Sequence, residues 1–135
     1  MIRFLPETFV VALHDNQIRL YGGSYGIRDT AMPNSALHTP CMQFEGKYLH
    51  PTIFEMAAAY GFHLCQNHPF IDGNKRTAGM AMLTFLKLNG LRPVATELDY
   101  YRVMMAVASG AMGKKELAIW LQTAVEGIPP SVNDK

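Results

Sequence analysis

The sequence predicts a mainly α-helical fold, a single bundle of five or six helices with one small β-hairpin. Three observations support this prediction. The chain has 135 residues and is 49% hydrophobic, which fits one domain with one core. Two segments, 51–67 and 74–90, are apolar on most faces, as central buried helices are. Helix start and stop signals recur at the ends of the other segments.

The first part of the chain is expected to hold two helices and the hairpin. The helix over 6–23 opens with a proline, which suits a first helical turn, and stops at a pair of glycines. A short helix is expected over 33–38. Residues 39–50 are too irregular for a helix, and Gly46, flanked by aromatic residues, favours a hairpin turn there.

The second part of the chain is expected to hold three further helices. The helix over 74–90 ends at an Asn-Gly pair. Thr96 and Asp99 have the spacing of a capping box, which predicts a helix over 97–110. The last helix is expected over 114–127, because its apolar residues form one stripe: Leu117, Trp120, Leu121 and Val125.

Composition narrows the class of protein. We expect one domain over 1–127 and a loose tail over 128–135, which has two prolines and few apolar groups. The net charge of +1 argues against a broad nucleic-acid surface, but not against a local basic pocket. No apolar run approaches the ~18 residues of a membrane span, and the first residues lack a signal-peptide pattern. We therefore expect a cytoplasmic protein that binds neither nucleic acid nor membrane directly.

A polar cluster, "NHPFIDGNKRTAG", joins the two central helices. The first N–H groups of a helix have no internal partners and lie at the positive end of its dipole, so they bind phosphate. Gly73 removes a side chain where a ligand would approach, and Asn74 can cap the helix or bond to a phosphate oxygen. Lys75 and Arg76 add positive charge that the dipole disfavours unless an anion arrives. These four residues predict an anion cradle.

Two further side chains of the cluster complete a possible reaction centre. Asp72 is a hard oxygen ligand that suits Mg²⁺ in contact with nucleotide phosphates. His68 can accept a proton from an attacking hydroxyl group near pH 7. A base, a metal ligand and a phosphate cradle together predict phosphoryl transfer from a nucleotide.

Structural interpretations of the same residues stay open at this point. Asp72 alone could be a helix cap, and Lys75 and Arg76 a solvated first turn. A zinc site at His50, His63 and His68 is not favoured, because their spacing does not put them on one helical face.

"HPFIDGNKR" resembles the signature of Fic-domain proteins, H-x-F-x-[D/E]-G-N-x-R. The chain is most similar to their death-on-curing (Doc) branch, the toxins of Phd–Doc toxin–antitoxin modules. "ALHDNQIRLYGGSYGIRD" and "ASGAMGKKELAIWL" are also similar to Doc toxins, so the resemblance covers nearly the whole chain. It implies a Fic/Doc-type helical bundle in which the hairpin is a flap that docks a target peptide.

The resemblance also implies a role for each residue of the signature. His68 matches the catalytic histidine, a general base acting on a target hydroxyl. Asp72 matches the acidic residue that holds Mg²⁺. Gly73 and Asn74 match the anion cradle, and Arg76 matches the arginine that contacts a phosphate.

Two departures from the AMP-transferring pattern, G-N-G-R-x-x-R, favour a kinase. Lys75 fills the second glycine position, and Gly79 stands in place of the final arginine. Both fit the Doc-type reaction, in which ATP binds reversed and its γ-phosphate is transferred. The resemblance thus implies ATP and Mg²⁺ as cofactors and a threonine of elongation factor Tu as the target. The alternatives are a protein AMP transferase and a mainly non-enzymatic transcriptional corepressor that acts with an antitoxin.

The chain lacks the inhibitory motif of some Fic proteins, [S/T]-x-x-x-E-[G/N]. Glu45 and Glu126 are each followed by glycine, but Cys41 and Gln122 stand where the Ser or Thr should be. The resemblance therefore implies inhibition by another chain, a Phd-like antitoxin.

Overall fold

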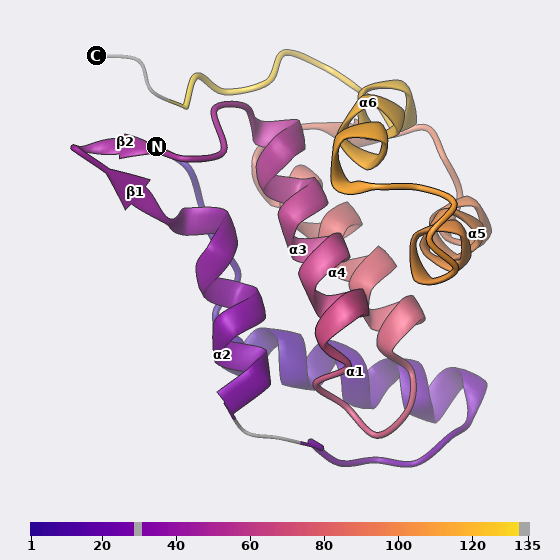
Figure 1. Ribbon diagram of the computed structural model, residues 1–135. Coiled ribbons are helices and arrows are strands. Elements are labelled where there is room, and N and C mark those ends of the chain that lie inside the picture. Colours follow the sequence, from indigo (N-terminus) through magenta and orange to yellow (C-terminus); the bar gives the residue numbers. More distant parts are fainter. Residues whose placement is uncertain (29–30, 133–135) are drawn as a thin grey trace.

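The computed structural model describes residues 1–28 and 31–132 and is mainly helical, as the sequence predicts (Figure 1). The helices of the described residues are α1 (Glu7–Tyr21), α2 (Ala31–His38), α3 (Ile53–Asn67), α4 (Asn74–Leu88), α5 (Glu97–Ala108) and α6 (Lys114–Ala124), with a 3₁₀ turn η1 (Thr39–Cys41) after α2. The strands are β1 (Gln43–Phe44), β2 (Lys47–Tyr48), β3 (Arg92–Pro93) and β4 (Val125–Glu126).

Helices α3 and α4 lie side by side at the centre of the bundle (Figure 1). Helix α1 crosses one end of this pair, α2 and the hairpin lie on one side, and α5 and α6 on the other. The central helices pack closely because α3 carries small residues. A Cβ on Gly61 would lie 2.2 Å from Sδ of Met82 in α4, so no larger residue fits there without rearrangement. This packing sets the distance between the two helices whose connecting loop carries the polar cluster.

The predicted hairpin is confirmed. Strands β1 and β2 are antiparallel, with Gln43 opposite Tyr48 and Phe44 opposite Lys47. The turn residues, Glu45 and Gly46, have φ of 52° and 79°. Positive φ at both central residues is the geometry of the turn that matches strand twist in two-residue hairpins. The hairpin extends from the body of the molecule beside the chain's first residues (Figure 1).

The predicted capping box of α5 is also confirmed. The Thr96 hydroxyl accepts a hydrogen bond from the Asp99 N–H at 3.1 Å, and the Asp99 carboxylate accepts one from the Thr96 N–H at 2.8 Å. The bonds from Thr96 lower the pKa of the Asp99 carboxyl. At α1 and α3 the expected opening proline lies just outside the helix. The N-cap residues are Pro6 and Thr52.

The prediction for the last helix was wrong at its C-terminal end. Helix α6 stops at Ala124 because Val125 and Glu126 pair with Pro93 and Arg92 in a second small sheet. Two-residue strands are too short to show an alternating pattern, so no local pattern predicts this pairing. The final three residues of the predicted tail, 128–135, lie outside the described residues.

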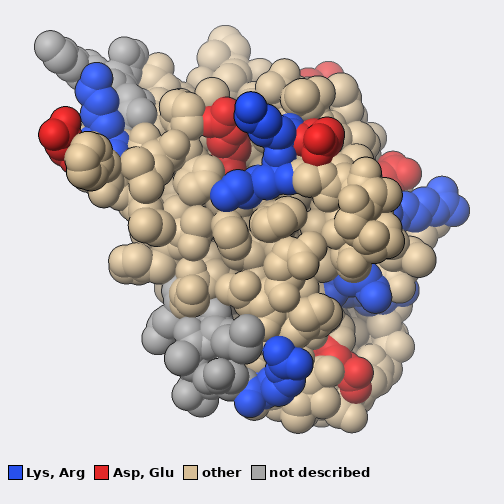
Figure 2. All heavy atoms as spheres, viewed as in Figure 1, with Lys and Arg blue, Asp and Glu red and all other residues tan. Residues whose placement is uncertain are grey.

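Charged side chains of both signs are interspersed on the face shown in Figure 2. This distribution agrees with the small net charge of +1. Among the described helices, none is both long and apolar enough to cross a membrane.

Candidate active site

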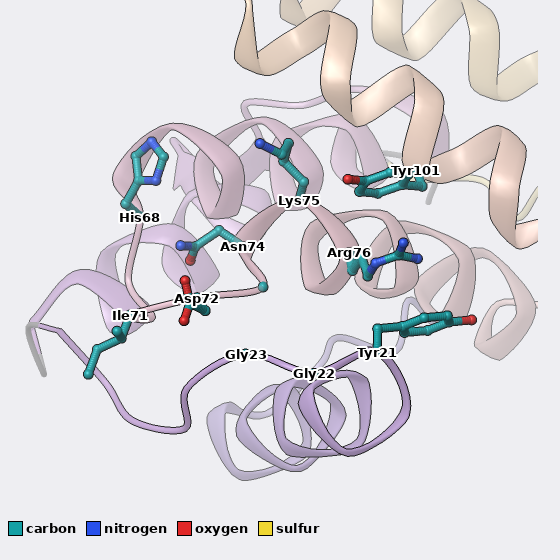
Figure 3. Close-up of a pocket in the computed structure, with 11 residues that line it drawn as sticks. Tyr21, Gly22, Gly23, His68, Ile71, Asp72, Asn74, Lys75, Arg76 and Tyr101 are labelled. Carbon is teal, nitrogen blue, oxygen red and sulfur yellow. The ribbon is translucent and has the colours of Figure 1, made fainter.

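A pocket of about 410 Å³ lies where the loop between α3 and α4 meets the end of α1 and the side of α5 (Figure 3). All six residues predicted for the site line it, together with residues from α1, the turn after it and α5. The lining residues are Tyr21, Gly22, Gly23, His68, Ile71, Asp72, Gly73, Asn74, Lys75, Arg76 and Tyr101.

His68 is exposed at the mouth of this pocket, directly after the last residue of α3. Its backbone is left-handed, with φ 49° and ψ 55°, a conformation that non-glycine residues seldom adopt. This conformation ends α3 and turns the chain into the loop. Within the part of the chain that the structure describes, the imidazole makes no hydrogen bond, so both ring nitrogens are available to a ligand.

Phe70 and Asn74 close the loop on itself. Phe70 is buried in the core at 1% exposure. The Asn74 side chain accepts a hydrogen bond from the Phe70 N–H at 3.0 Å and donates one to the Phe70 carbonyl at 2.9 Å. Both ends of the amide are thus engaged by the loop backbone. Asn74 therefore stabilises the loop conformation at the start of α4. Its amide is not a free group in the pocket.

Gly73 is required by packing as well as by conformation. Its φ of 77° lies in the left-handed region, and a Cβ would come within 3.0 Å of Cδ1 of Ile18 in α1. The sequence suggested that glycine leaves room for a ligand at this position. The close neighbour of the missing side chain is instead helix α1, which packs against the start of α4.

Asp72 is held from two directions. One carboxylate oxygen, Oδ2, accepts a hydrogen bond of 2.8 Å from the N–H of Ser24, in the turn after α1. Its main-chain carbonyl accepts a hydrogen bond of 2.7 Å from Nε2 of His14. The same turn is joined to the loop by a hydrogen bond of 3.1 Å, which the Ile71 N–H donates to the Gly26 carbonyl. The carboxylate therefore lines the pocket with Oδ2 held in place, and within the described part of the chain Oδ1 makes no hydrogen bond or ion pair.

Lys75 and Arg76 occupy the first turn of α4, as predicted. Lys75 is exposed along the pocket wall. The Arg76 guanidinium lies between two rings, 3.9 Å from the centroid of Tyr21 and 4.1 Å from that of Tyr101 (Figure 3). Two cations at the positive end of a helix favour occupation of the pocket by an anion.

Four contributors to the site were missed from the sequence: His14, Tyr21, Ser24 and Tyr101. A weak signal existed for His14. It lies at helical spacing with Val10 and Ile18 on the buried face of α1, and a polar residue there needs a partner. No local pattern marks the others, because Tyr21 and Tyr101 are ordinary aromatic residues and Ser24 contributes only its main-chain N–H.

A second polar cluster lies away from this pocket. The Lys114 ammonium is 3.3 Å from Nε2 of His50 and 3.2 Å from Nε2 of His63. Burial and the Lys114 charge lower the pKa of both histidines, that of His63 to about 4. The imidazoles are thus neutral acceptors for the ammonium. His68, the third residue of the zinc hypothesis, does not join this pair but lines the pocket described above.

Comparison with known proteins places the chain in a family. The profile of the Fic/DOC family matches residues 4–86, more than half of the chain. The chain belongs to the Fic/DOC family. The matched segment begins before α1 and ends within α4, so it contains the loop, its helices and the turn after α1.

Two curated relatives in this family have names that state a function. The chain is 37% identical over 82 residues to the protein named toxin Doc of Mycolicibacterium smegmatis, covering 61% of this chain. That alignment spans 62% of the relative, less than two thirds of its length. The chain is 34% identical over 92 residues to the protein named protein kinase doc of Escherichia phage P1, covering 67% of this chain and 71% of the relative.

Proposed function

We propose that this protein is a Doc-type toxin that transfers the γ-phosphate of ATP to a serine or threonine hydroxyl of a translation factor, elongation factor Tu. One observation carries the proposal. An exposed imidazole, an oriented carboxylate and a cationic helix start line one pocket, in a chain related to a protein named protein kinase doc. The modification would arrest translation, and a cognate antitoxin would neutralise the protein.

The residues that line the pocket fit ATP with Mg²⁺. Asp72 presents a carboxylate oxygen, Oδ1, that has no hydrogen-bond partner among the described residues, and would hold Mg²⁺ there together with phosphate oxygens and water. The bound ion would supply neutralisation of negative charge on the phosphates. Lys75, Arg76 and the first N–H groups of α4 offer donors to the same phosphates.

His68 acts as the general base in the proposed reaction. Its imidazole accepts the proton of the attacking hydroxyl as the new oxygen–phosphorus bond forms and the bond to the leaving ADP breaks. An exposed position at the pocket mouth suits this role, because a protein substrate must reach the imidazole from outside. The flap, β1 and β2, offers a strand edge at which an extended target peptide could add.

Lys75 favours γ-phosphate transfer over AMP transfer. Its side chain lines the pocket at the position where AMP-transferring relatives have glycine, so it fills space that their phosphates use. The final arginine of those relatives is also absent, since Gly79 stands there and is buried against Tyr100 and Met104. A side chain at position 79 would point into the α4–α5 packing.

The test is label transfer to purified elongation factor Tu, with ATP labelled at the γ- or the α-phosphate. We expect γ-label on the factor, none from α-label, and loss of labelling with His68→Ala. His38→Ala, an exposed histidine outside the pocket, is the matched control and should label normally. Transfer of α-label would instead support the AMP transferase. Toxicity that survives His68→Ala would support the corepressor.

A further inference from the structure

Arg76 is held between two tyrosines that come from opposite sides of the pocket (Figure 3). Tyr21 is the last residue of α1, and Tyr101 lies in the first half of α5. The guanidinium carbon lies 3.9 Å above one ring centroid and 4.1 Å above the other. Such distances are those of cation–π contacts on both faces of the cation. All three residues line the same pocket as His68 and Asp72.

This arrangement leaves the hydrogen-bonding edge of the guanidinium unused. The five N–H donors of arginine lie in its plane, whereas the tyrosine rings cover only its two faces. Among the described residues, Arg76 forms neither an ion pair nor a hydrogen bond. Glu97 lines the adjoining groove with Arg76, but no ion pair joins them. The donors are therefore free for an anion in the pocket.

We infer that Tyr21 and Tyr101 are positioning residues, which fix Arg76 so that its in-plane donors meet a phosphate of the bound nucleotide. The inference rests on the proposed function and adds two residues that the signature does not contain. A free arginine side chain has many rotamers and loses that freedom when it binds. Two rings that confine it beforehand remove much of this loss. They also shield its faces from water, which strengthens its interaction with a phosphate.

A purely structural role for the rings makes a different prediction. Aromatic side chains often cover the alkyl part of an arginine without any effect on ligand binding. In that case removal of one ring would change stability alone. A third possibility is that a tyrosine stacks on the base of the nucleotide and acts without Arg76. A double-mutant cycle and a ligand without a base separate these possibilities.

The experiment measures the affinity of ATP and of inorganic tripolyphosphate by calorimetry, in a His68→Ala parent that can be produced without toxicity. Tyr101→Leu removes one ring, Tyr101→Phe keeps it, and Tyr21→Leu tests the other ring from a different helix. Each change is repeated with Arg76→Met. In each folded variant that keeps Arg76, its Nε–H proton resonance is shifted by the ring currents of the two tyrosines and so reports whether the guanidinium still lies between them.

We expect either leucine substitution to lower the affinity for both ligands about tenfold. The Tyr101→Phe variant should bind both ligands as tightly as the parent. In the leucine variants that keep Arg76, its Nε–H resonance should move toward its position in an unfolded chain. The loss of affinity should disappear when Arg76 is already methionine. Equal losses with and without Arg76, or weakened ATP with unchanged tripolyphosphate, would overturn the inference and leave the proposed function standing. Unchanged affinities with a displaced resonance would do the same. A parent that binds no ATP would overturn the proposed function and the inference with it.

Discussion

Nε2 of His14 donates a hydrogen bond of 2.7 Å to the main-chain carbonyl of Asp72. A carbonyl can only accept, so this nitrogen carries a proton. The imidazole is 1% exposed and stacks on Phe70, with 3.8 Å between ring centroids and 6° between the planes. One buried side chain of α1 therefore contacts two residues of the loop that carries His68, and it anchors the main chain of Asp72.

The first prediction concerns this hydrogen bond. His14→Phe keeps a ring against Phe70 but leaves the partly buried Asp72 carbonyl without its donor. We expect the free energy of unfolding to fall by roughly 1–3 kcal/mol, measured by urea denaturation. Asp15→Asn is the control, because it removes only a half-exposed partner 3.5 Å from Nδ1 of His14 and should cost less than about 1 kcal/mol. Equal stability of the two variants would contradict the anchoring role.

The second prediction separates backbone strain from packing at Gly73. Gly90 also has positive φ, 90°, but a Cβ there would meet nothing within 4 Å. Gly90→Ala should therefore cost only the conformational penalty, roughly 1 kcal/mol. Gly73→Ala should cost about 1 kcal/mol more, because its Cβ would press on Cδ1 of Ile18 at 3.0 Å.

The excess can be assigned to Ile18 by a double mutant. Ile18→Val removes Cδ1, so the combination with Gly73→Ala should be less destabilising than the sum of the two single changes, as judged by urea denaturation. Additive losses would mean that the neighbour of Gly73 in solution is not Ile18.

The third prediction follows from the pair of histidines at Lys114. Their pKa values are lowered in the folded protein, for His63 from 6.5 to about 4, by burial first and Lys114 second. Below pH 6.5 the unfolded chain therefore binds more protons than the folded one, and stability falls as the pH drops toward 4. The stability that the two neutral imidazoles contribute is fully present above pH 6.5. Urea denaturation between pH 7.5 and 5 should show this loss.

Two controls test the origin of that pH dependence. Lys114→Met removes the charge but not the burial, so the pKa of His63 should rise and the loss below pH 6.5 should become smaller. Proton NMR titration of the imidazole follows this directly. Titration of Asp99 does not contribute to the loss of stability in this pH range. Its pKa is lowered from 3.8, so its contribution is lost only at lower pH than the range used. An unchanged His63 titration in the variant would contradict the Lys114 effect.

The parts of the fold that the sequence could predict are those with local causes. The hairpin turn at Glu45 and Gly46, the Thr96–Asp99 capping box and the stop of α1 at Gly22 each depend on a few adjacent residues. The polar residues from His68 to Arg76 line one pocket for the same reason, since a single short loop and helix start carry them all.

The parts that could not be predicted depend on contacts between distant segments. The tyrosines around Arg76 lie in α1 and α5, and nothing in either helix alone indicates that they meet. Sheet β3–β4 pairs Val125 and Glu126 with Pro93 and Arg92, which are far apart in the sequence. The engagement of the Asn74 amide by Phe70 is local, but it requires the loop conformation that burial of Phe70 imposes.

The fourth prediction tests the proposed role of Asp72 in catalysis apart from its role in the loop. Asp72→Asn keeps an oxygen that can accept the Ser24 N–H, and the main-chain bond from His14 does not involve the side chain. Loop structure and stability should therefore stay close to wild type. The lost charge should reduce γ-label transfer by on the order of a hundredfold at saturating Mg²⁺, because a neutral amide is a poor ligand for this ion.

The matched change is Asp15→Asn, which removes an exposed carboxylate that does not line the pocket. It should transfer label at the wild-type rate. Thermal unfolding and the Arg76 Nε–H resonance would verify that Asp72→Asn retains the native loop. Wild-type transfer by a correctly folded Asp72→Asn protein would show that this carboxylate binds no ion needed for the reaction. The pocket would then have to neutralise the phosphates with Lys75, Arg76 and the α4 N–H groups alone.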